Sequence, residues 1–226
     1  MFKTKFRVGT RASPLALKQT EEAIGFLKRL DPKSEFEVVR IETYGDKDKT
    51  TPISEIEGSD FFTREIDEAL LRCEIDFAVH SAKDVANELA DGLTIAAVTK
   101  SVDPHDALVS KGNLKLDELP VGATIGTSSQ RRKEQLKRYR PDFKIVNIRG
   151  AIEERLAFLD GNLDAIVIAA SALVRLGLET RIAERMPFTI MKPHPLQGSL
   201  AVVARREDLN LISFLSRIDT RETVLL

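Results

Sequence analysis

Short apolar runs alternate with longer amphipathic segments along the first half of the chain. Short runs rich in β-branched residues are typical of strands, whereas segments with helically spaced apolar residues are typical of helices. These patterns predict strands at 5–9, 36–43, 76–81 and 93–98, and helices at 13–30 and 61–73. Ser13 and Pro14 supply the expected cap and first-turn proline of the first helix. This order predicts a parallel or mixed sheet covered by helices.

The same alternation restarts in the second half of the chain. It predicts strands at 122–127, 143–149 and 164–170, and helices at 128–140, 151–160 and 171–178. Residues 100–120 are expected to form the crossover between two α/β units, because prolines and a glycine interrupt them. The apolar segment 198–206 is expected to return to the first unit as a late strand. We therefore predict two similar α/β lobes with a cleft between them: 1–99 plus 198–226, and 100–197.

Composition narrows the kinds of site that the chain can hold. The 226 residues carry a formal net charge of −1, so any site for an anion must be local. A single cysteine, Cys73, excludes an intrachain disulfide, and with three histidines it leaves little for a metal cluster. We expect Cys73 in the core and His80 as a hydrogen-bonded histidine near it. The N-terminus lacks the apolar core of a signal peptide, which predicts a cytoplasmic protein outside the membrane.

Four polar stretches fall where a predicted strand ends. Ligands of open α/β sheets bind at the carboxyl ends of strands, so these stretches are the candidate site. They read "GTRASP" (9–14), "HSAKDV" (80–85), "GTSSQRR" (126–132) and "IRGAIEER" (148–155).

The third stretch has the chemistry of an oxyanion site. Thr127, Ser128 and Ser129 stand at a predicted helix start, where backbone N–H groups and hydroxyls can bind an anion. Arg131 and Arg132 add planar donors suited to carboxylates. The alternative is an ordinary helix cap followed by solvated arginines. Nucleic-acid binding by the basic segment 131–140 is disfavoured, because no helix-turn-helix context or aromatic stacking partner is visible.

Asp84 is the best candidate for acid–base chemistry. It follows the buried strand 76–79 and stands next to Lys83, so an ionised carboxylate there can stabilise a cation or handle a proton. The alternative is a structural Asp–Lys pair on the surface. The polar segment 43–60 is either a lid over the site or a solvated loop.

Six segments in this order closely resemble the hydroxymethylbilane synthases, also called porphobilinogen deaminases. The resemblance spans Phe6 to about Glu222, and it is specific because the motifs occur together. They are "TRASPLAL" (10–17), "DFAVHSAKDV" (76–85), "DPHDALVS" (103–110), "IGTSSQRR" (125–132), "IRG" (148–150) with Arg155, and "RLGLETRI" (175–182).

The resemblance implies an activity and a fold. The family is a group of transferases of heme and tetrapyrrole biosynthesis that join four porphobilinogen molecules head to tail, with release of ammonia. Its first two lobes resemble type II periplasmic binding proteins. Each pyrrole carries an acetate and a propionate, so the expected ligands are porphobilinogen, linear pyrroles and a dipyrromethane cofactor, without a metal or nucleic acid.

The resemblance also implies roles for individual residues. Asp84 is expected to contact the pyrrole nitrogens and to stabilise the cationic methylene-pyrrolenine formed on deamination, with Lys83 and Arg11 as its catalytic neighbours. The implied substrate- and cofactor-binding residues are Ser13, Phe62, Ser81, Thr127, Ser128, Ser129, Arg131, Arg132, Arg149, Gly150, Arg155, Arg175, Gln197 and Gly198.

The chain departs from the family pattern in three places. The sequence stops at 217–226, where the family's third, α+β domain with its cofactor-bearing cysteine should begin, so that domain is expected to be absent. Cys73 does not match that cysteine, which leaves the attachment residue unknown and predicts non-covalent or unusual attachment of dipyrromethane. The lid segment 54–62 has Glu55 and Ser59 where lysines are common. The usual "GQG" turn reads "LQG" (196–198).

Three hypotheses follow from these departures. The first is a naturally short synthase that holds its primer non-covalently or by another residue. The second is a fragment, or a chain that works with a partner supplying the third domain or with the next enzyme of the pathway. The third is a non-catalytic binding module for polycarboxylate pyrroles.

Overall fold

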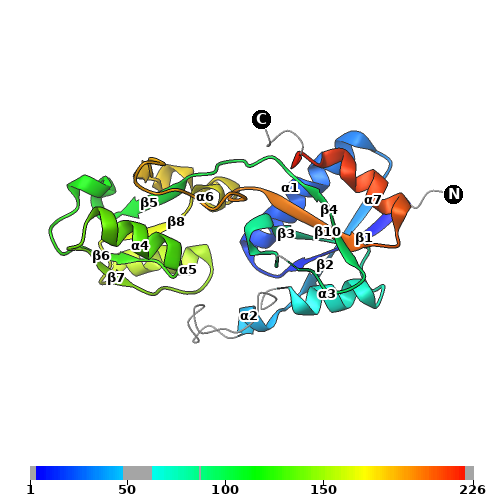
Figure 1. Cartoon of the computed structure of the whole chain (residues 1–226), viewed down its shortest axis with the longest axis horizontal. Helices are drawn as coiled ribbons and strands as arrows, with labels where there is room; N and C mark the ends of the chain where they lie inside the picture. The colour runs from blue at the N-terminus through cyan, green and yellow to red at the C-terminus, as the bar shows by residue number, and fades with distance from the viewer. Residues whose placement is uncertain (1–3, 48–62, 87, 222–226) are drawn as a thin grey trace. The chain divides into compact units, whose positions relative to one another are not determined.

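The computed structural model describes residues 4–47, 63–86 and 88–221. These residues divide into two compact units. Unit 1 holds 4–47, 63–101 and 199–221, and unit 2 holds 102–198. Each unit contains one five-stranded sheet flanked by helices (Figure 1).

The sheet of unit 1 has the order β2-β1-β3-β10-β4. Strand β1 pairs in parallel with β2 and β3, whereas β10 runs antiparallel to β3 and β4. The predicted late strand therefore returns to the first unit and makes the sheet mixed. The strands are β1 (Lys5–Arg11), β2 (Glu35–Ile41), β3 (Phe77–Ser81), β4 (Leu93–Val98) and β10 (Leu200–Arg205), and the helices are α1 (Pro14–Leu30), α2 (Tyr44–Lys47), α3 (Arg64–Leu71) and α7 (Leu209–Leu215).

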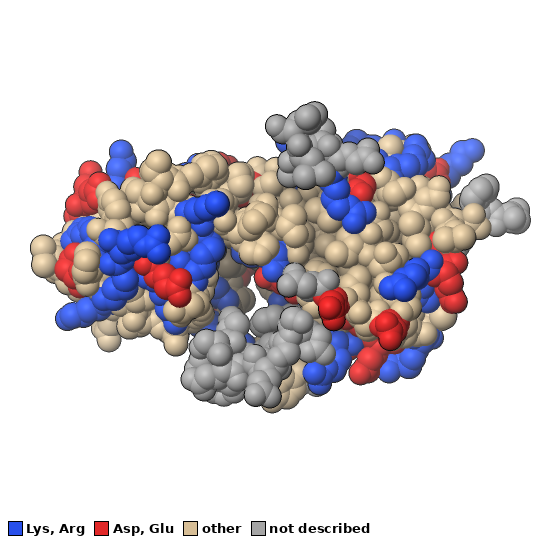
Figure 2. All heavy atoms as spheres, in the orientation of Figure 1, with Lys and Arg blue, Asp and Glu red and all other residues tan. Residues whose placement is uncertain are grey.

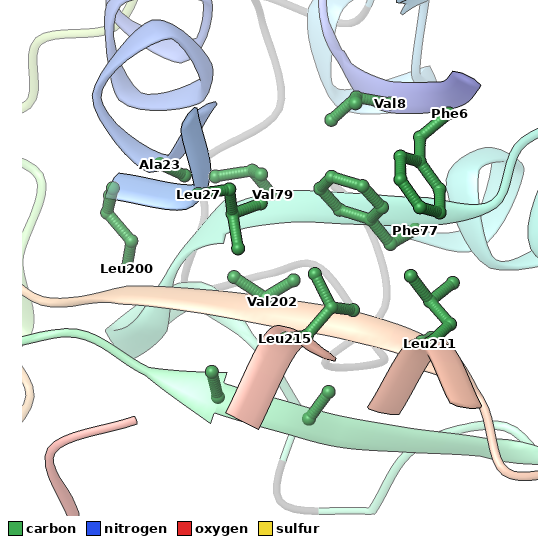
Figure 3. Close-up of a cluster of buried hydrophobic side chains, with 13 residues drawn as sticks. Phe6, Val8, Ala23, Leu27, Phe77, Val79, Leu200, Val202, Leu211 and Leu215 are labelled. Carbon is green, nitrogen blue, oxygen red and sulfur yellow. The ribbon is translucent and has the colours of Figure 1, made fainter. Parts of the chain in front are cut away.

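Helix α1 begins where the sequence predicts. The hydroxyl of Ser13 accepts a hydrogen bond from the amide of Ala16 at 3.3 Å, and Pro14 occupies the first turn. Such a cap contributes about 1 kcal/mol, because it satisfies a backbone donor that has no helical partner. The apolar core on the α1 side of the sheet combines β1, β3, β10, α1 and α7 (Figure 3): Phe6, Val8, Ala23, Leu27, Phe77, Val79, Leu200, Val202, Leu211 and Leu215.

The opposite face of this sheet is covered by α3. Ile66 and Leu70 of α3 pack there against Ala78 of β3. Burial on both faces explains why β3 reads as a continuous apolar run rather than as an alternating one. The edge strand β2 is mostly exposed or half-buried, as its charged residues indicate.

The sheet of unit 2 has the order β7-β6-β8-β5-β9. Strand β6 pairs in parallel with β7 and β8, and β5 runs antiparallel to β8 and β9. The strands are β5 (Asp106–Ser110), β6 (Thr124–Gly126), β7 (Lys144–Val146), β8 (Ala165–Ala169) and β9 (Glu184–Arg185), and the helices are α4 (Gln130–Tyr139), α5 (Ile152–Ala157) and α6 (Ala170–Arg175).

Strand β5 corrects the expectation that 100–120 is only a crossover. Prolines and a glycine surround the segment "DALVS", but the segment itself is apolar and lies buried between β8 and β9. The helix α7 and the short strand β9 were also missed by the sequence analysis. Among the described residues, no helix is both long and apolar enough to cross a membrane.

Candidate functional site

The carboxyl end of the unit 1 sheet gathers one group of predicted site residues. Arg11 is the last residue of β1, and Ser81 is the last residue of β3. Lys83 and Asp84 follow Ser81 in a single 3₁₀ turn (Ala82–Asp84), which the amide of Ala82 fixes to the carbonyl oxygen of Ser199 at 3.0 Å. Asp84 is exposed and Lys83 is half-buried. Because β1 and β3 are parallel neighbours, these groups share one edge of the sheet.

Two polar contacts hold side chains at this edge. The amide nitrogen Nε2 of Gln19, which is buried in α1, donates to Oγ of Ser81 at 2.7 Å. The guanidinium of Arg11 binds the carboxylate of Asp46, with Nε 3.1 Å from Oδ1. Burial raises the pKa of Asp46, but the hydrogen bond and charge of Arg11, together with Thr43, hold it below its usual value. Asp46 and Gln19 were not identified from the sequence, because neither stands in one of the four stretches.

His80 is buried, as expected. Its Nε2 has no hydrogen-bond partner among the described residues. Burial lowers the pKa of His80 to about 4, and the nearby charge of Arg11 acts in the same direction. The imidazole is therefore neutral near pH 7, which avoids placing a second positive charge beside Arg11.

The unit 2 sheet carries the second group, at the end of β6. Thr127 is buried, and its Oγ1 lies 3.5 Å from the amide of Ser129, the residue that caps α4. Ser128 points elsewhere: its hydroxyl contacts the carbonyl oxygen of Ile148 and accepts from the amide of the same residue at 3.1 Å. Ser128 therefore joins the ends of β6 and β7, whereas half-buried Ser129 stands at the helix start.

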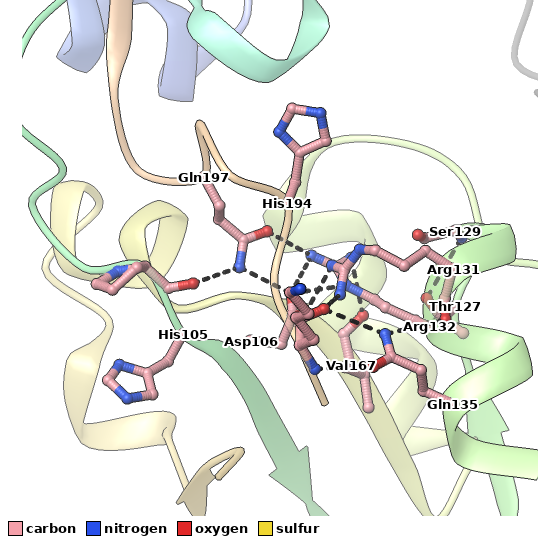
Figure 4. A network of polar contacts seen from close by, with 12 residues as sticks. His105, Asp106, Thr127, Ser129, Arg131, Arg132, Gln135, Val167, His194 and Gln197 are labelled. Carbon is pink, nitrogen blue, oxygen red and sulfur yellow. Dashed lines mark hydrogen bonds and ion pairs between the residues drawn. The ribbon is translucent and has the colours of Figure 1, made fainter. Parts of the chain in front are cut away.

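Arg131 and Arg132 converge on one buried carboxylate, that of Asp106 (Figure 4). Nη2 of Arg131 lies 2.7 Å from Oδ2, and Nε of Arg132 lies 2.8 Å from Oδ1. Arg132 is itself buried and also donates to the carbonyl oxygen of Val167 and to Oε1 of Gln197. Burial raises the pKa of Asp106, but the two guanidinium charges hold it below its usual value. The network leaves Arg131 as the more accessible arginine of the pair.

Gln197 and Gly198 connect the same network to the segments that enter and leave unit 2. Nε2 of Gln197 donates to the carbonyl oxygen of Pro104 at 2.8 Å and to Asp106 at 3.0 Å. The carbonyl oxygen of Gly198 accepts from Nη2 of Arg175 at 2.8 Å. Both residues of the predicted turn thus have contacts within the protein, and Asp106, which was not singled out from the sequence, contacts three of the predicted site residues.

Arg149, Gly150 and Arg155 lie together after β7. Nε of Arg155 donates to the carbonyl oxygen of Gly150 at 2.9 Å, and both arginines are half-buried. Gly150 has a φ of 105°, and a Cβ there would lie 2.4 Å from Oε2 of Glu154. This turn therefore requires glycine, and it places two arginines near the start of α5.

The basic residues of α4 beyond the arginine pair lie on the surface. Figure 2 shows Lys and Arg side chains over the part of unit 2 that α4 occupies in Figure 1. Lys137 of α4 and Arg140, which follows the helix, contact the next loop. Nζ of Lys137 donates to the carbonyl oxygens of Pro141 and Phe143, and the guanidinium of Arg140 lies over the Phe143 ring.

The expectation that Cys73 belongs to the core was wrong. Cys73 is exposed and has a φ of 57°, because the chain turns out of α3 in the left-handed conformation at this position. Phe62, Glu55 and Ser59 lie outside the described residues. Among the described residues, no group of three His, Cys, Asp or Glu side chains could hold a metal ion.

The sequence profile described as "Porphobilinogen deaminase, dipyromethane cofactor binding domain" matches residues 6–213. The chain belongs to the porphobilinogen deaminase family.

Curated porphobilinogen deaminases cover the chain almost completely. The protein of Brevibacillus brevis is 44% identical over 222 residues, which is 98% of this chain and 72% of the relative. The protein of Pelotomaculum thermopropionicum is 45% identical over 99% of this chain and 72% of its own length. The protein of Geobacillus kaustophilus is 46% identical over 96% of this chain and 71% of its own length. The family resemblance of the motifs is thereby confirmed.

Solved structures confirm the predicted class of lobe. An ancestral cationic amino acid solute binding protein aligns with a TM-score of 0.57 over 95% of this chain and 88% of its own, at 16% identity. The immunogenic lipoprotein A of Vibrio vulnificus aligns with a TM-score of 0.56 over 97% of this chain and 96% of its own, at 15% identity. The porphobilinogen deaminase chain therefore has mixed-sheet lobes of the type II periplasmic-binding-protein kind.

Proposed function

We propose that the chain is a hydroxymethylbilane synthase that condenses four porphobilinogen molecules head to tail. The observation that carries this proposal is the exposed Asp84 carboxylate. It is held with Lys83 in a fixed turn at the carboxyl end of the unit 1 sheet, where β1 ends in Arg11. A carboxylate at the end of a buried strand is suited to a reaction in which a cation develops on the substrate. The curated relatives that match nearly the whole chain are named porphobilinogen deaminase, which is the other name of this synthase.

Each condensation takes place in two steps. The C–N bond of the aminomethyl group of porphobilinogen breaks, ammonia leaves, and positive charge spreads into the pyrrole ring. The α-carbon of the neighbouring pyrrole then forms the new C–C bond and loses its proton. Asp84 lowers the energy of the charged ring by accepting a hydrogen bond from the pyrrole N–H and by its own negative charge.

The arginines and hydroxyls hold the acetate and propionate groups. In unit 1 the donors are Arg11, Lys83 and Ser81, and in unit 2 they are Ser129 and Arg131. Guanidinium and helix-start N–H groups bind carboxylates by charge-assisted hydrogen bonds. Arg149 and Arg155 extend the same chemistry along the end of the unit 2 sheet, which suits a ligand with several carboxylates.

The residues present also fit a dipyrromethane cofactor. That group is a polycarboxylate, and a family profile for its binding domain matches the chain. Within unit 1, Ser81 and Lys83 at the end of β3 would supply donors to its carboxylates. Within unit 2, Ser129 and Arg131 at the start of α4 would supply the same kind of donor. When bound, the cofactor supplies the pyrrole to which the first substrate is joined. A cytoplasmic location and a protein partner stay predictions.

Turnover is tested by incubating the purified chain with porphobilinogen, with and without added hydroxymethylbilane as a source of primer. Release of ammonia and formation of uroporphyrin after oxidation are the expected results. Asp84→Asn should abolish both while binding porphobilinogen about as well, since the amide keeps the shape without the charge. Binding by the wild-type chain without turnover under either condition would identify a binding module instead.

A further inference from the structure

The ion pair between Arg11 and Asp46 lies beside the proposed substrate position in unit 1. We propose that Asp46 is a positioning residue, which orients the Arg11 guanidinium so that it receives a substrate carboxylate. This inference rests on the proposed function, because that function assigns to Arg11 the binding of a substrate carboxylate. Asp46 stands in none of the motifs that indicated the site.

Arg11 lies on the face of the sheet that α3 covers. The parallel register aligns Gly9 of β1 with Ala78 of β3, and Arg11 and His80 each follow two residues later. Residues two apart on a strand share a face, so Arg11 and His80 belong to the α3 side with Ala78. A flexible arginine at the last position of a strand needs a fixed partner to keep one orientation.

Asp46 is held in place independently of Arg11. Its Oδ2 accepts hydrogen bonds from the amide of Thr43 at 3.1 Å and from the hydroxyl of Thr43 at 2.8 Å. Thr43 is fully buried. The amide of Tyr44 in turn donates to Oε1 of Glu65 at 2.9 Å, which links α2 to α3. Asp46 therefore has a set position before Arg11 binds it.

The contact with Arg11 is side-on. Nε lies 3.1 Å from Oδ1 and 3.3 Å from Oδ2, and Nη2 also contacts Oδ1. A planar guanidinium bound along this edge has little rotational freedom left. Its five N–H groups point in fixed directions, so the edge that faces Asp46 determines where the other edge faces.

The neighbouring His80 does not compete for this pairing. Its buried imidazole is neutral near pH 7, as its low pKa indicates. The carboxylate of Asp46 therefore pairs with the guanidinium of Arg11 and not with a charged histidine. Because both side chains of the pair are less than one third exposed, solvent screens their attraction only in part. The charge of Asp46 thus acts on the guanidinium of Arg11.

Asp46→Asn tests this role, because the amide keeps the shape but loses the second charge-assisted acceptor. We expect the KM for porphobilinogen to rise about tenfold and kcat to change less, since Asp84 is untouched. In an Arg11→Lys background the same substitution should have little effect, because no planar group remains to be oriented. Asp46→Glu should restore part of the loss.

Asp31→Asn is the matched control. Asp31 is likewise fixed by a hydroxyl three residues away, that of Ser34 at 2.6 Å, but it follows α1 at the opposite end of the sheet. It should leave KM unchanged. A lower KM in Asp46→Asn would overturn the proposal, because Asp46 would then compete with the substrate. An equal rise in both Arg11 backgrounds would overturn it as well.

A second readout separates this proposal from the proposed function. The Nε–H resonance of Arg11, assigned by its loss in Arg11→Lys, reports the contact with Asp46 without any turnover. If the wild-type chain lacks turnover but Asp46→Asn shifts and broadens this resonance, the proposed function fails while the positioning contact stands. An unchanged resonance in Asp46→Asn, together with unchanged KM, rejects the positioning role.

Discussion

Asp106 and Arg132 form a buried ion pair in unit 2, with 2.7 Å between Oδ1 and Nη2. Asp106 is fully buried and starts β5, whereas Arg132 lies in the first turns of α4. The pair thus joins a strand that follows the entry into unit 2 to the helix that follows the "GTSS" segment. Gln197 adds the returning segment to the same contact.

Removal of the Asp106 charge should destabilise the protein strongly. Asp106→Asn leaves two guanidinium groups facing a neutral amide, and the loss of one partner of a buried pair costs about 3 kcal/mol or more. The urea midpoint of unfolding should fall accordingly. Glu68→Gln, which removes an exposed partner of Arg72, should leave the midpoint unchanged. Equal midpoints for Asp106→Asn and the wild type would contradict a structural role of this network.

His80 should make stability depend on pH between about 6.5 and 4. Its folded pKa of about 4 lies below the ordinary 6.5, so the unfolded chain binds the proton more readily. The stabilisation is complete above pH 6.5 and is lost as the pH falls through 4, to a total of about 3 kcal/mol. Denaturation measured at several pH values should show this loss in the wild type and less of it in His80→Asn. The same pH dependence in both proteins would exclude His80 as its source.

Gln19 should act on substrate binding through Ser81. Gln19→Met keeps the length of the side chain but removes the donor to Ser81, and a hydrogen bond of this kind contributes about 1 kcal/mol. We expect a severalfold rise in the KM for porphobilinogen, a similar rise in Ser81→Ala, and no further rise when the two are combined. Additive effects in steady-state kinetics would show that Gln19 acts by another route.

Cys73→Gly should stabilise the protein relative to Cys73→Ala. The residue has a φ of 57°, which costs a side chain with a Cβ about 1 kcal/mol but costs glycine little. Thermal melting of the two variants measures the difference directly. Because Cys73 is exposed, neither substitution opens a cavity. A less stable glycine variant would mean that the greater freedom of the unfolded chain outweighs the relieved strain.

Local patterns were sufficient for much of the fold. Ser13 and Pro14 marked the start of α1, and apolar runs located β3, β4 and β8, because strands that are largely buried need apolar residues at most positions. The break before the last strand indicated its return to the first unit, and the strand order confirms that return. The motifs also identified the family, because their order and spacing are specific.

Local patterns failed where burial depends on distant segments. Strand β5 lies among residues that favour turns, and it becomes a strand because β8 and β9 pair with it. Cys73 reads as part of an apolar helix, but α3 ends two residues earlier and the chain turns outward.

The sequence by itself determined the family, most of the strands and helices, and the positions of the cationic residues near strand ends. Only the tertiary structure decided which partners those residues have: Asp46 for Arg11, Gln19 for Ser81, and Asp106 for both Arg131 and Arg132. The reason is physical, because hydrogen bonds and ion pairs depend on distances of a few ångströms between atoms. Residues far apart in the sequence reach such distances only when strands and helices pack together.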